Sequence, residues 1–284
     1  MIGFRWLGVA GFELEWNGSI LLVDPFLTRP PAYKLLFGRT RPDGALLRKH
    51  IPRADHILIS HSHYDHLLDA AEIASYTGAR VYGSAHTCRI VEAFGLPPGQ
   101  IQQVQAGELL VLCPGTPLTI SAMPQPSKAA FEVTVVPGEH ATVAFFGPRE
   151  LPADLRYPFR LRDFMLDEDF GFLIRAGETS ILSWHHWRPG PAPRAEVLVI
   201  GADIHPCDLP ELLDQVQPCL LIPSHWDNFL RPLSKPIRPF FRPPSPTHPL
   251  PGRYDPWKLK RWVARVRPGV EVYVPRLFER IDLQ

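Results

Sequence analysis

Short apolar runs separated by turn residues dominate the first quarter of the chain. Residues 2–6, 11–16 and 19–23 are apolar or alternate between apolar and polar positions, and an Asn-Gly pair separates the second run from the third. A period of two is typical of strands, and Asn-Gly between two such runs indicates a two-residue hairpin turn. The pattern predicts three strands, followed by a long loop over residues 29–44, where prolines and glycines accumulate.

The remainder of the chain alternates between strand-like and helix-like patterns. The predicted elements are a buried strand at 56–60, a helix from Asp69 to Tyr76 ending at Gly78, a strand at 81–82, a helix from Ser84 to Phe94, a hairpin over 171–175 and 179–182, strands at 197–200 and 219–222, helices over Leu209–Val216 and Pro256–Val266, and a closing strand at 271–274. Strands that alternate with helices favour an α/β domain.

Composition narrows the choice of function. Hydrophobic residues make up 45% of the chain and charged residues 21%, which is an ordinary globular balance. Lys and Arg number 30 against 29 Asp and Glu, so the net charge is +1 and a nucleic-acid partner is not expected. No apolar run reaches the roughly 20 residues of a spanning helix. Glu13 and Glu15 come too early for a secretory signal, so we expect a cytoplasmic protein.

Proline is unusually abundant, with 33 residues, and this count excludes a long helical bundle. Nine prolines fall between residues 231 and 256. We interpret the chain as one domain over 1–284 with a proline-rich loop insertion at about 231–256. The insertion is either a surface loop without a task or a lid or dimer arm beside a functional site.

The chemistry of the chain concentrates in Ser-His-Ser-His-Tyr-Asp-His, residues 60–66, directly after a predicted strand. Imidazole nitrogens and carboxylate oxygens are the usual ligands of zinc and also bind manganese and iron. In an extended loop His61 and His63 point the same way and could share one ion, whereas Asp65 and His66 could face a neighbouring ion. The segment predicts a site for one or two ions, with Zn²⁺ favoured and Mn²⁺ or Fe²⁺ as alternatives.

The motif HSHYDH resembles the metal motif of the metallo-β-lactamase superfamily. The opening WLGVAGFELEWNGSILLVDPF resembles the first strands of the branch that contains ascorbate-6-phosphate lactonase and N-acylphosphatidylethanolamine phospholipase D. The resemblance extends over nearly the whole chain. It implies a four-layer αββα sandwich with a metal site at one edge of two packed sheets.

The resemblance also implies further ligands. His140 in Pro-Gly-Glu-His matches the third histidine of the first metal, and His225 after the strand 219–222 matches the last histidine of the second. The family's bridging aspartate is absent, and His185 occupies its position. We therefore expect a filled first site and a weaker or empty second one. The first site comprises His61, His63 and His140, and the second comprises Asp65, His66 and His225, with His185 as an optional ligand.

The expected reaction is hydrolysis of a phosphodiester, lactone or similar ester by a metal-bound hydroxide. Asp65 would accept the proton of the attacking water or orient that water. Asp24 either orients a ligand histidine or caps the turn before Pro25. The alternative is a metal-binding member of the family with a degenerate second site and little or no hydrolytic activity. A ligand-sensing or scaffold protein is a third possibility.

Basic residues in the proline-rich insertion slightly favour a small anionic substrate. Phe240 and Phe241 in the same insertion could contact an acyl chain or a membrane surface. Membrane contact and a homo-oligomer stay open. His186 could orient a ligand or act as an acid or base, but its pattern alone does not assign it a role.

Overall fold

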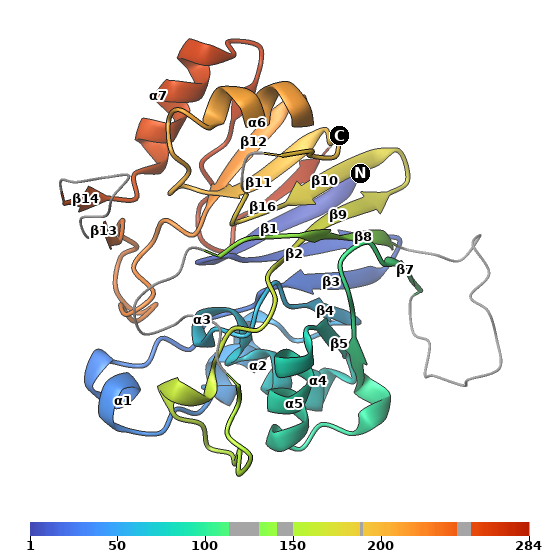
Figure 1. Cartoon of the computed structure of the whole chain (residues 1–284), viewed down its shortest axis with the longest axis vertical. Coiled ribbons are helices and arrows are strands. Elements are labelled where there is room, and N and C mark those ends of the chain that lie inside the picture. The colour runs from blue at the N-terminus through green and yellow to red at the C-terminus, as the bar shows by residue number, and fades with distance from the viewer. Residues whose placement is uncertain (114–130, 141–149, 188–189, 243–250, 284) are drawn as a thin grey trace.

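Two packed β-sheets with helices on both outer faces form the body of the molecule (Figure 1). The computed structural model describes residues 1–113, 131–140, 150–187, 190–242 and 251–283. The four layers confirm the predicted αββα sandwich. No helix in these described ranges has the length and apolar character needed to cross a membrane.

The first sheet has the strand order β16-β1-β2-β3-β4-β5-β6. Its strands are β1 (Ile2–Gly8), β2 (Gly11–Trp16), β3 (Ser19–Val23), β4 (His56–Leu58), β5 (Arg80–Gly83), β6 (Ile101–Gln103) and β16 (Arg280–Leu283). The two opening hairpins are antiparallel, and the pairs from β3 to β6 are parallel. The prediction that 271–274 closes the chain is wrong, because β16 follows and pairs with β1.

The second sheet has the order β15-β12-β11-β10-β9-β8-β7. Its strands are β7 (Leu109–Leu112), β8 (Phe131–Pro137), β9 (Phe170–Ala176), β10 (Thr179–Ser183), β11 (Val197–Gly201), β12 (Leu220–Ser224) and β15 (Glu271–Val272). The pairs from β10 to β15 are parallel. Their carboxyl ends therefore lie at one edge of the sheet, where side chains on the following loops can meet.

The helices are α1 (Ala32–Phe37), α2 (Gly44–His50), α3 (Tyr64–Leu67), α4 (Ala70–Thr77), α5 (Ala85–Phe94), α6 (Leu209–Val216) and α7 (Pro256–Val266), with 3-10 turns η1 (Pro98–Gln100) and η3 (Leu161–Asp163). The hydroxyl of Ser84 accepts a hydrogen bond from Thr87 N and caps α5, as predicted. The prediction of a loop over 29–44 is wrong, since α1 lies inside it. Good helix formers follow Pro31 there and outweigh the surrounding prolines and glycines.

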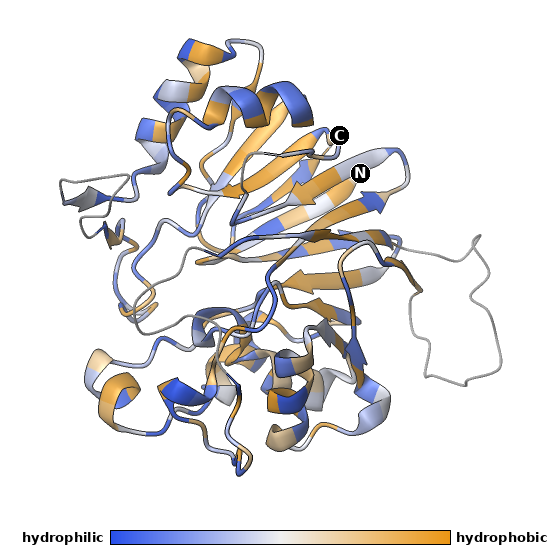
Figure 2. Cartoon of the chain, in the orientation of Figure 1, coloured by the Kyte–Doolittle hydropathy of each residue, from blue (hydrophilic) through white to orange (hydrophobic). Residues whose placement is uncertain are grey.

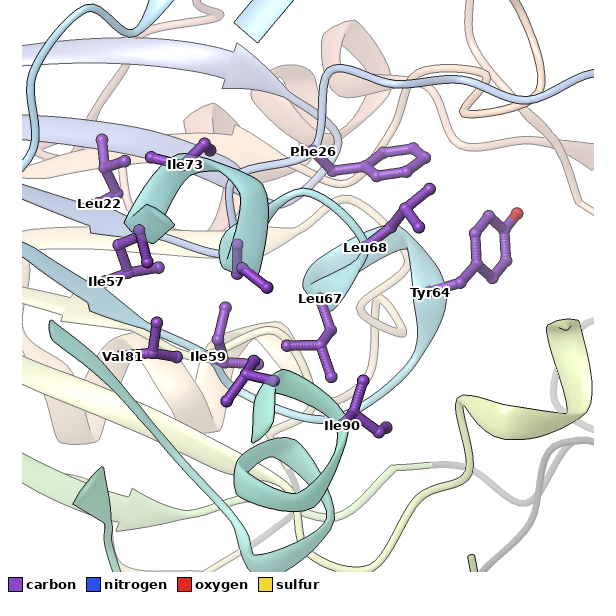
Figure 3. Close-up of a cluster of buried hydrophobic side chains, with 14 of the residues drawn as sticks. Leu22, Phe26, Ile57, Ile59, Tyr64, Leu67, Leu68, Ile73, Val81 and Ile90 are labelled. Atoms are coloured by element: carbon purple, nitrogen blue, oxygen red, sulfur yellow. The ribbon is translucent and has the colours of Figure 1, made fainter. Parts of the chain in front are cut away.

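Three apolar clusters hold the layers together. Figure 2 shows that hydrophobic residues, in orange, are frequent along the strands of both sheets. The cluster between the two sheets contains Phe12, Phe131 and Phe172. Figure 3 shows the cluster that packs the first sheet against α3, α4 and α5, with Ile57 and Ile73 in it. A third cluster packs α6 and α7 on the second sheet. Burial of apolar area at about 25 cal/mol per Å² is the main stabilising contribution.

The proline-rich segment is mostly irregular where it is described, with a short hairpin of β13 (Phe241–Arg242) and β14 (Gly252–Arg253). Its residues 243–250 lie outside the described residues. Phe240 donates its backbone N–H to the Trp226 carbonyl at 2.7 Å, and its ring lies 4.4 Å from that of Phe229. The segment is therefore fastened to the loop that follows β12.

Candidate metal centre

Loops at the carboxyl ends of four strands bring the candidate ligands together. His61 and His63 follow β4, and the first turn of α3 then carries Asp65 and His66. The remaining histidines follow β8, β10 and β12 respectively: His140, His185 and His225. The sequence analysis considered an extended loop for HSHYDH, residues 61–66. The segment is not fully extended, because Tyr64–Leu67 is helical. That turn separates Asp65 and His66 from the first two histidines.

The first cluster contains His61, His63 and His140. One ring nitrogen from each lies within 4.8 Å of the others. The ring centroid of His61 is 4.7 Å from that of His63 and 5.0 Å from that of His140. Nε2 of His61 is buried and has no hydrogen-bond partner among the described residues. A buried polar atom without a partner is costly, so this nitrogen is suited to binding a metal ion.

The second cluster contains Asp65, His66 and His225, whose ligand atoms also lie within 4.8 Å of one another. Asp65 Oδ2 is 3.4 Å from His225 Nε2 and 3.9 Å from His66 Nε2. This carboxylate therefore faces both imidazoles. The two clusters adjoin, because the rings of His61 and His66 are 3.9 Å apart between centroids.

The electrostatics differ between the clusters. Burial, together with the neighbouring imidazoles, holds the pKa of His61 well below its usual value and keeps this ring in the neutral form that binds metals. Burial alone would raise the pKa of Asp65, but the hydrogen bond from His225 and the charges of nearby histidines outweigh it and lower this pKa. The same Asp65 contact overcomes burial at His225 and raises the pKa of that histidine to about 9.

Asp24 lies behind the second cluster and is fully buried. Its Oδ1 accepts a hydrogen bond from Ser60 N at 2.7 Å, and its Oδ2 accepts one from Ser60 Oγ at 2.6 Å and lies 2.9 Å from His66 Nδ1. The carboxylate is thus occupied by Ser60 and His66. This geometry fits the interpretation that Asp24 orients a histidine better than a turn cap before Pro25.

His185 lies beside the second cluster but outside the group of atoms within 4.8 Å. Its ring centroid is 6.1 Å from that of His66 and 6.2 Å from that of His225. Nδ1 of His185 lies 3.0 Å from Ser224 Oγ, and Nε2 is buried without a hydrogen-bond partner among the described residues. Burial and the neighbouring imidazoles lower the pKa of this ring. His185 is therefore neutral, with one nitrogen available.

Asp169 is the residue that the sequence analysis missed. Its Oδ1 lies 3.2 Å from His61 Nδ1 and its Oδ2 lies 3.1 Å from His186 Nδ1. Burial opposes a charge on His186, but Asp169 outweighs it and raises the pKa of this imidazole. The carbonyls of Asp169 and His186 also accept backbone hydrogen bonds from Gly138 and Glu139, just before His140. The only indication in the sequence was that this acidic residue directly precedes the strand that begins at Phe170.

Together these residues fit a divalent cation. The donor set is made of imidazoles and carboxylate, which suits zinc, manganese and iron, and two buried Nε2 atoms are without partners among the described residues. His61, His66 and His186 each have a carboxylate within 3.2 Å of Nδ1. Carboxylates in that position fix the ring orientation of metal-binding histidines, which applies to His61 and His66 among these three.

Comparison with known proteins shows the family of the chain. The Beta-lactamase superfamily domain matches residues 20–153. A metal-dependent hydrolase of Pyrobaculum arsenaticum is 31% identical over 160 residues, covering 56% of this chain and 67% of that protein. The chain belongs to the metallo-β-lactamase superfamily of metal-dependent hydrolases. The narrower branch of ascorbate-6-phosphate lactonase and N-acylphosphatidylethanolamine phospholipase D stays a prediction.

Solved structures share the fold at low sequence identity. Igni18, a metallo hydrolase from Ignicoccus hospitalis, has a TM-score of 0.61 and 16% identity, and the match covers 100% of this chain and 99% of Igni18. CmlA from Streptomyces venezuelae, a diiron β-hydroxylase, has a TM-score of 0.56 and 16% identity over 99% of this chain and 54% of CmlA. One fold thus serves different chemistries, so the substrate must be argued from the site.

Proposed function

We propose that this hydrolase cleaves an ester-type small molecule, a phosphodiester, lactone or similar compound, at the two adjoining clusters. The observation that carries the proposal is the gathering of six side chains from β4, α3, β8 and β12 into two groups whose ligand atoms lie within 4.8 Å. His61, His63 and His140 would hold the first ion. Asp65, His66 and His225 would hold the second.

Zinc is the ion that we favour, with manganese or iron as alternatives, because imidazoles dominate the donor set. A bound ion supplies Lewis acidity and lowers the pKa of a coordinated water towards 7. His225 must lose a proton to become a ligand. Its raised pKa, about 9, means that binding at the second cluster competes with a proton shared with Asp65.

Asp65 is better suited to orienting the attacking water than to accepting its proton. A carboxylate whose pKa is lowered is a weak base, but it accepts hydrogen bonds well. His186 lies 4.2 Å from His140 between ring centroids and is held by Asp169. Its raised pKa makes it a candidate for donating a proton to the leaving group. We assign it that role within the proposal.

The alternative function is metal binding with little or no hydrolysis. It is supported by the position of His185, which has the place of the family's bridging aspartate but lies outside the 4.8 Å group. An imidazole offers one lone pair to one ion, whereas a carboxylate can bind two. A weakly held second ion would then leave only the first cluster occupied.

Metal analysis combined with a substrate panel tests these proposals. Purified protein is equilibrated with zinc or manganese, its metal content is measured, and chromogenic phosphodiester, lactone and thioester substrates are assayed. We expect one to two ions per chain and turnover of at least one ester. His140→Gln should lower the metal content at the first cluster and His225→Gln at the second. His50→Gln, in the last turn of α2, is the matched control.

Three results would decide against parts of the proposal. Protein that retains no ion contradicts both the hydrolase and the metal-binding alternative. One ion without turnover favours the alternative. If His140→Gln and His225→Gln bind as much metal as the wild type and His50→Gln, the clusters are not the binding sites. A cytoplasmic location, a single domain with an insertion at 231–256 and an anionic substrate stay predictions. Membrane contact and a homo-oligomer stay open.

A further inference from the structure

A concave site is formed by residues other than the candidate metal ligands. It is a cavity of about 480 Å³, bounded on one side by residues between Leu27 and Leu46 and on the other by Pro232, Leu233 and Ser234. The first wall includes α1, which lies at the outer end of the lower helical layer in Figure 1. None of the candidate metal ligands lines this cavity.

Positive charge dominates the cavity wall. Lys34, Arg39 and Arg41 line it, and Asp43 is the acidic residue among the lining side chains. Asp43 Oδ1 accepts a hydrogen bond from Leu46 N at the start of α2, so this carboxylate serves as a helix cap. Among the described residues, no carboxylate forms an ion pair with Lys34, Arg39 or Arg41. Their charges are therefore available to a ligand.

Arg29 also lies in the wall, but its charge is balanced by an ion pair with Asp227. Its guanidinium is 2.6 Å from Asp227 Oδ2 and donates to the carbonyl of Asn228 at 3.1 Å. Arg39 keeps its charge while Nη1 donates to the Pro158 carbonyl at 2.6 Å. That bond fixes the Arg39 side chain. Lys34, Arg39 and Arg41 are all exposed. The Arg41 guanidinium lies 5.5 Å from the centroid of the Tyr157 ring, a cation–π contact that leaves its charge in place.

Leucines, prolines and three hydroxyl residues, Thr28, Thr40 and Ser234, form the rest of the wall. Leu27, Leu46 and Leu233 line the cavity together with several prolines. A volume near 500 Å³ falls within the range of small-molecule pockets, which are usually about 300–1,000 Å³. Both features favour an organic molecule that carries a charged group over a macromolecule, which would contact a flatter and larger surface.

We propose that this cavity is a binding site for a small organic anion, with a phosphate or carboxylate held by Lys34 and Arg41 and an apolar portion against Leu46 and Leu233. Arginine and lysine together suit both anion types, because guanidinium binds in a forked geometry and ammonium binds as a point charge. The site shares no residue with the metal clusters. It therefore stands or falls independently of the proposed hydrolysis.

Calorimetric titration of the full chain tests the proposal, with phenyl phosphate and benzoate as probes and benzyl alcohol as the uncharged counterpart. We expect saturable binding of at least one anion and none of the alcohol. Lys34→Gln and Arg41→Gln should each weaken binding by about tenfold or more, because each removes a charged hydrogen bond. Lys49→Gln, an exposed lysine in the last turn of α2 outside the wall, should leave the affinity unchanged.

Treatment with a chelator distinguishes anion binding in this cavity from anion binding at the metal clusters. Affinity that is unchanged after treatment with a chelator, but lost in the Lys34→Gln/Arg41→Gln double variant, supports the cavity. Affinity that is lost on chelation and unchanged in the double variant places the anion at the metal and overturns the proposal. An absence of saturable binding up to about 10 mM, weaker than nearly all specific small-molecule sites, also overturns it. Thermal unfolding of each variant confirms that the fold is intact.

Discussion

The backbone N–H of His225 donates to the carbonyl oxygen of Val9 at 2.8 Å, and both residues have left-handed backbone conformations, with φ of 52° and 51°. Such conformations cost about 1–3 kcal/mol each in residues other than glycine and persist only where the surroundings enforce them. Val9 N in turn donates to Asp227 Oδ1 at 2.8 Å, and Asp227 pairs with Arg29. The turn between β1 and β2 therefore positions a candidate metal ligand.

This relationship predicts an unequal effect of two glycine substitutions. Gly8 has φ of +98°, and a Cβ there would lie 2.4 Å from Arg29 Nη2, whereas Gly18 has φ of +77° with open space around it. Gly18→Ala should cost about 1–2 kcal/mol from the backbone alone. Gly8→Ala should cost about 1–3 kcal/mol more, because Arg29 must move. Urea unfolding of both variants measures the difference.

Metal content is the second quantity to measure in Gly8→Ala and Gly18→Ala. Displacement of Arg29 should disturb Asp227 and hence the loop of His225, so Gly8→Ala should also lower occupancy at the second cluster. Gly18→Ala should not. Equal unfolding free energies and equal metal contents in the two variants would show that the turn and the cluster are independent.

A second prediction concerns His185, which we expect to occupy the place of the family's bridging aspartate. His185→Asp restores a carboxylate next to the second cluster, at a position where the present Nε2 lies 3.9 Å from Asp24 Oδ2. Without metal, two neighbouring buried carboxylates should destabilise the fold, and with metal the added negative charge should strengthen binding of the second ion. The melting temperature should therefore differ more between metal-loaded and chelated protein than in the wild type, by about 2–4 °C per kcal/mol.

His185→Asn is the matched control for this substitution, because it has the size of aspartate without the charge. A widened temperature gap in the aspartate variant alone supports the interpretation that the wild-type histidine weakens the second site. The same gap in wild type, His185→Asp and His185→Asn would mean that position 185 does not influence the second ion.

Local patterns predicted much of the fold, and the failures have physical causes. The period-two runs and the capping residues Ser84 and Gly78 located their strands and helices, since these signals act over a few residues. The closing strand β16 was missed because its pairing with β1 joins the two ends of the chain, and no local signal encodes that contact. Helix α1 was missed because prolines and glycines around it dominated the reading of residues 29–44.

The candidate site shows the same division. The spacing within HSHYDH indicated that its histidines and Asp65 bind metal. The family resemblance extended the set of ligands to His140 and His225. Asp169 could not be predicted, because it meets His61 and His186 only through tertiary contacts. The φ of 52° at His225 is likewise invisible in the sequence. A single sequence thus indicates which residues could bind a metal, but not the tertiary contacts that position them.

A third prediction tests the role of Asp65. Asp65→Asn keeps the size of the side chain but removes the charge that faces His66 and His225. We expect turnover to fall by about 100-fold or more, because a positioned carboxylate contributes about that much, while one ion stays at the first cluster. Asp154→Asn, at an exposed carboxylate, should retain full activity. Full activity of Asp65→Asn with unchanged metal content would contradict the proposed role.

The last prediction concerns a buried carboxylate outside the metal clusters. Asp69 is fully buried at the start of α4, where Oδ2 accepts hydrogen bonds from Leu27 N at 2.6 Å and Thr28 N at 2.7 Å. Burial raises the pKa of Asp69 to about 6 despite these hydrogen bonds. The unfolded value is about 3.9. Between these two values the folded state therefore holds more protons than the unfolded state, and its stability falls as the pH rises.

Asp69→Asn should remove this dependence, since the amide oxygen can accept the same two hydrogen bonds and has no proton to lose. The shift of about two units corresponds to about 3 kcal/mol. We expect the unfolding free energy of Asp69→Asn relative to wild type to rise by up to that amount between pH 4 and pH 7.5. Asp69 Oδ1 has no hydrogen-bond partner among the described residues, so the amide nitrogen there adds a constant penalty that does not vary with pH. Denaturant unfolding of both proteins across this range measures the change, and because all other titrating groups are common to the two proteins, a constant difference would show that Asp69 has an ordinary pKa.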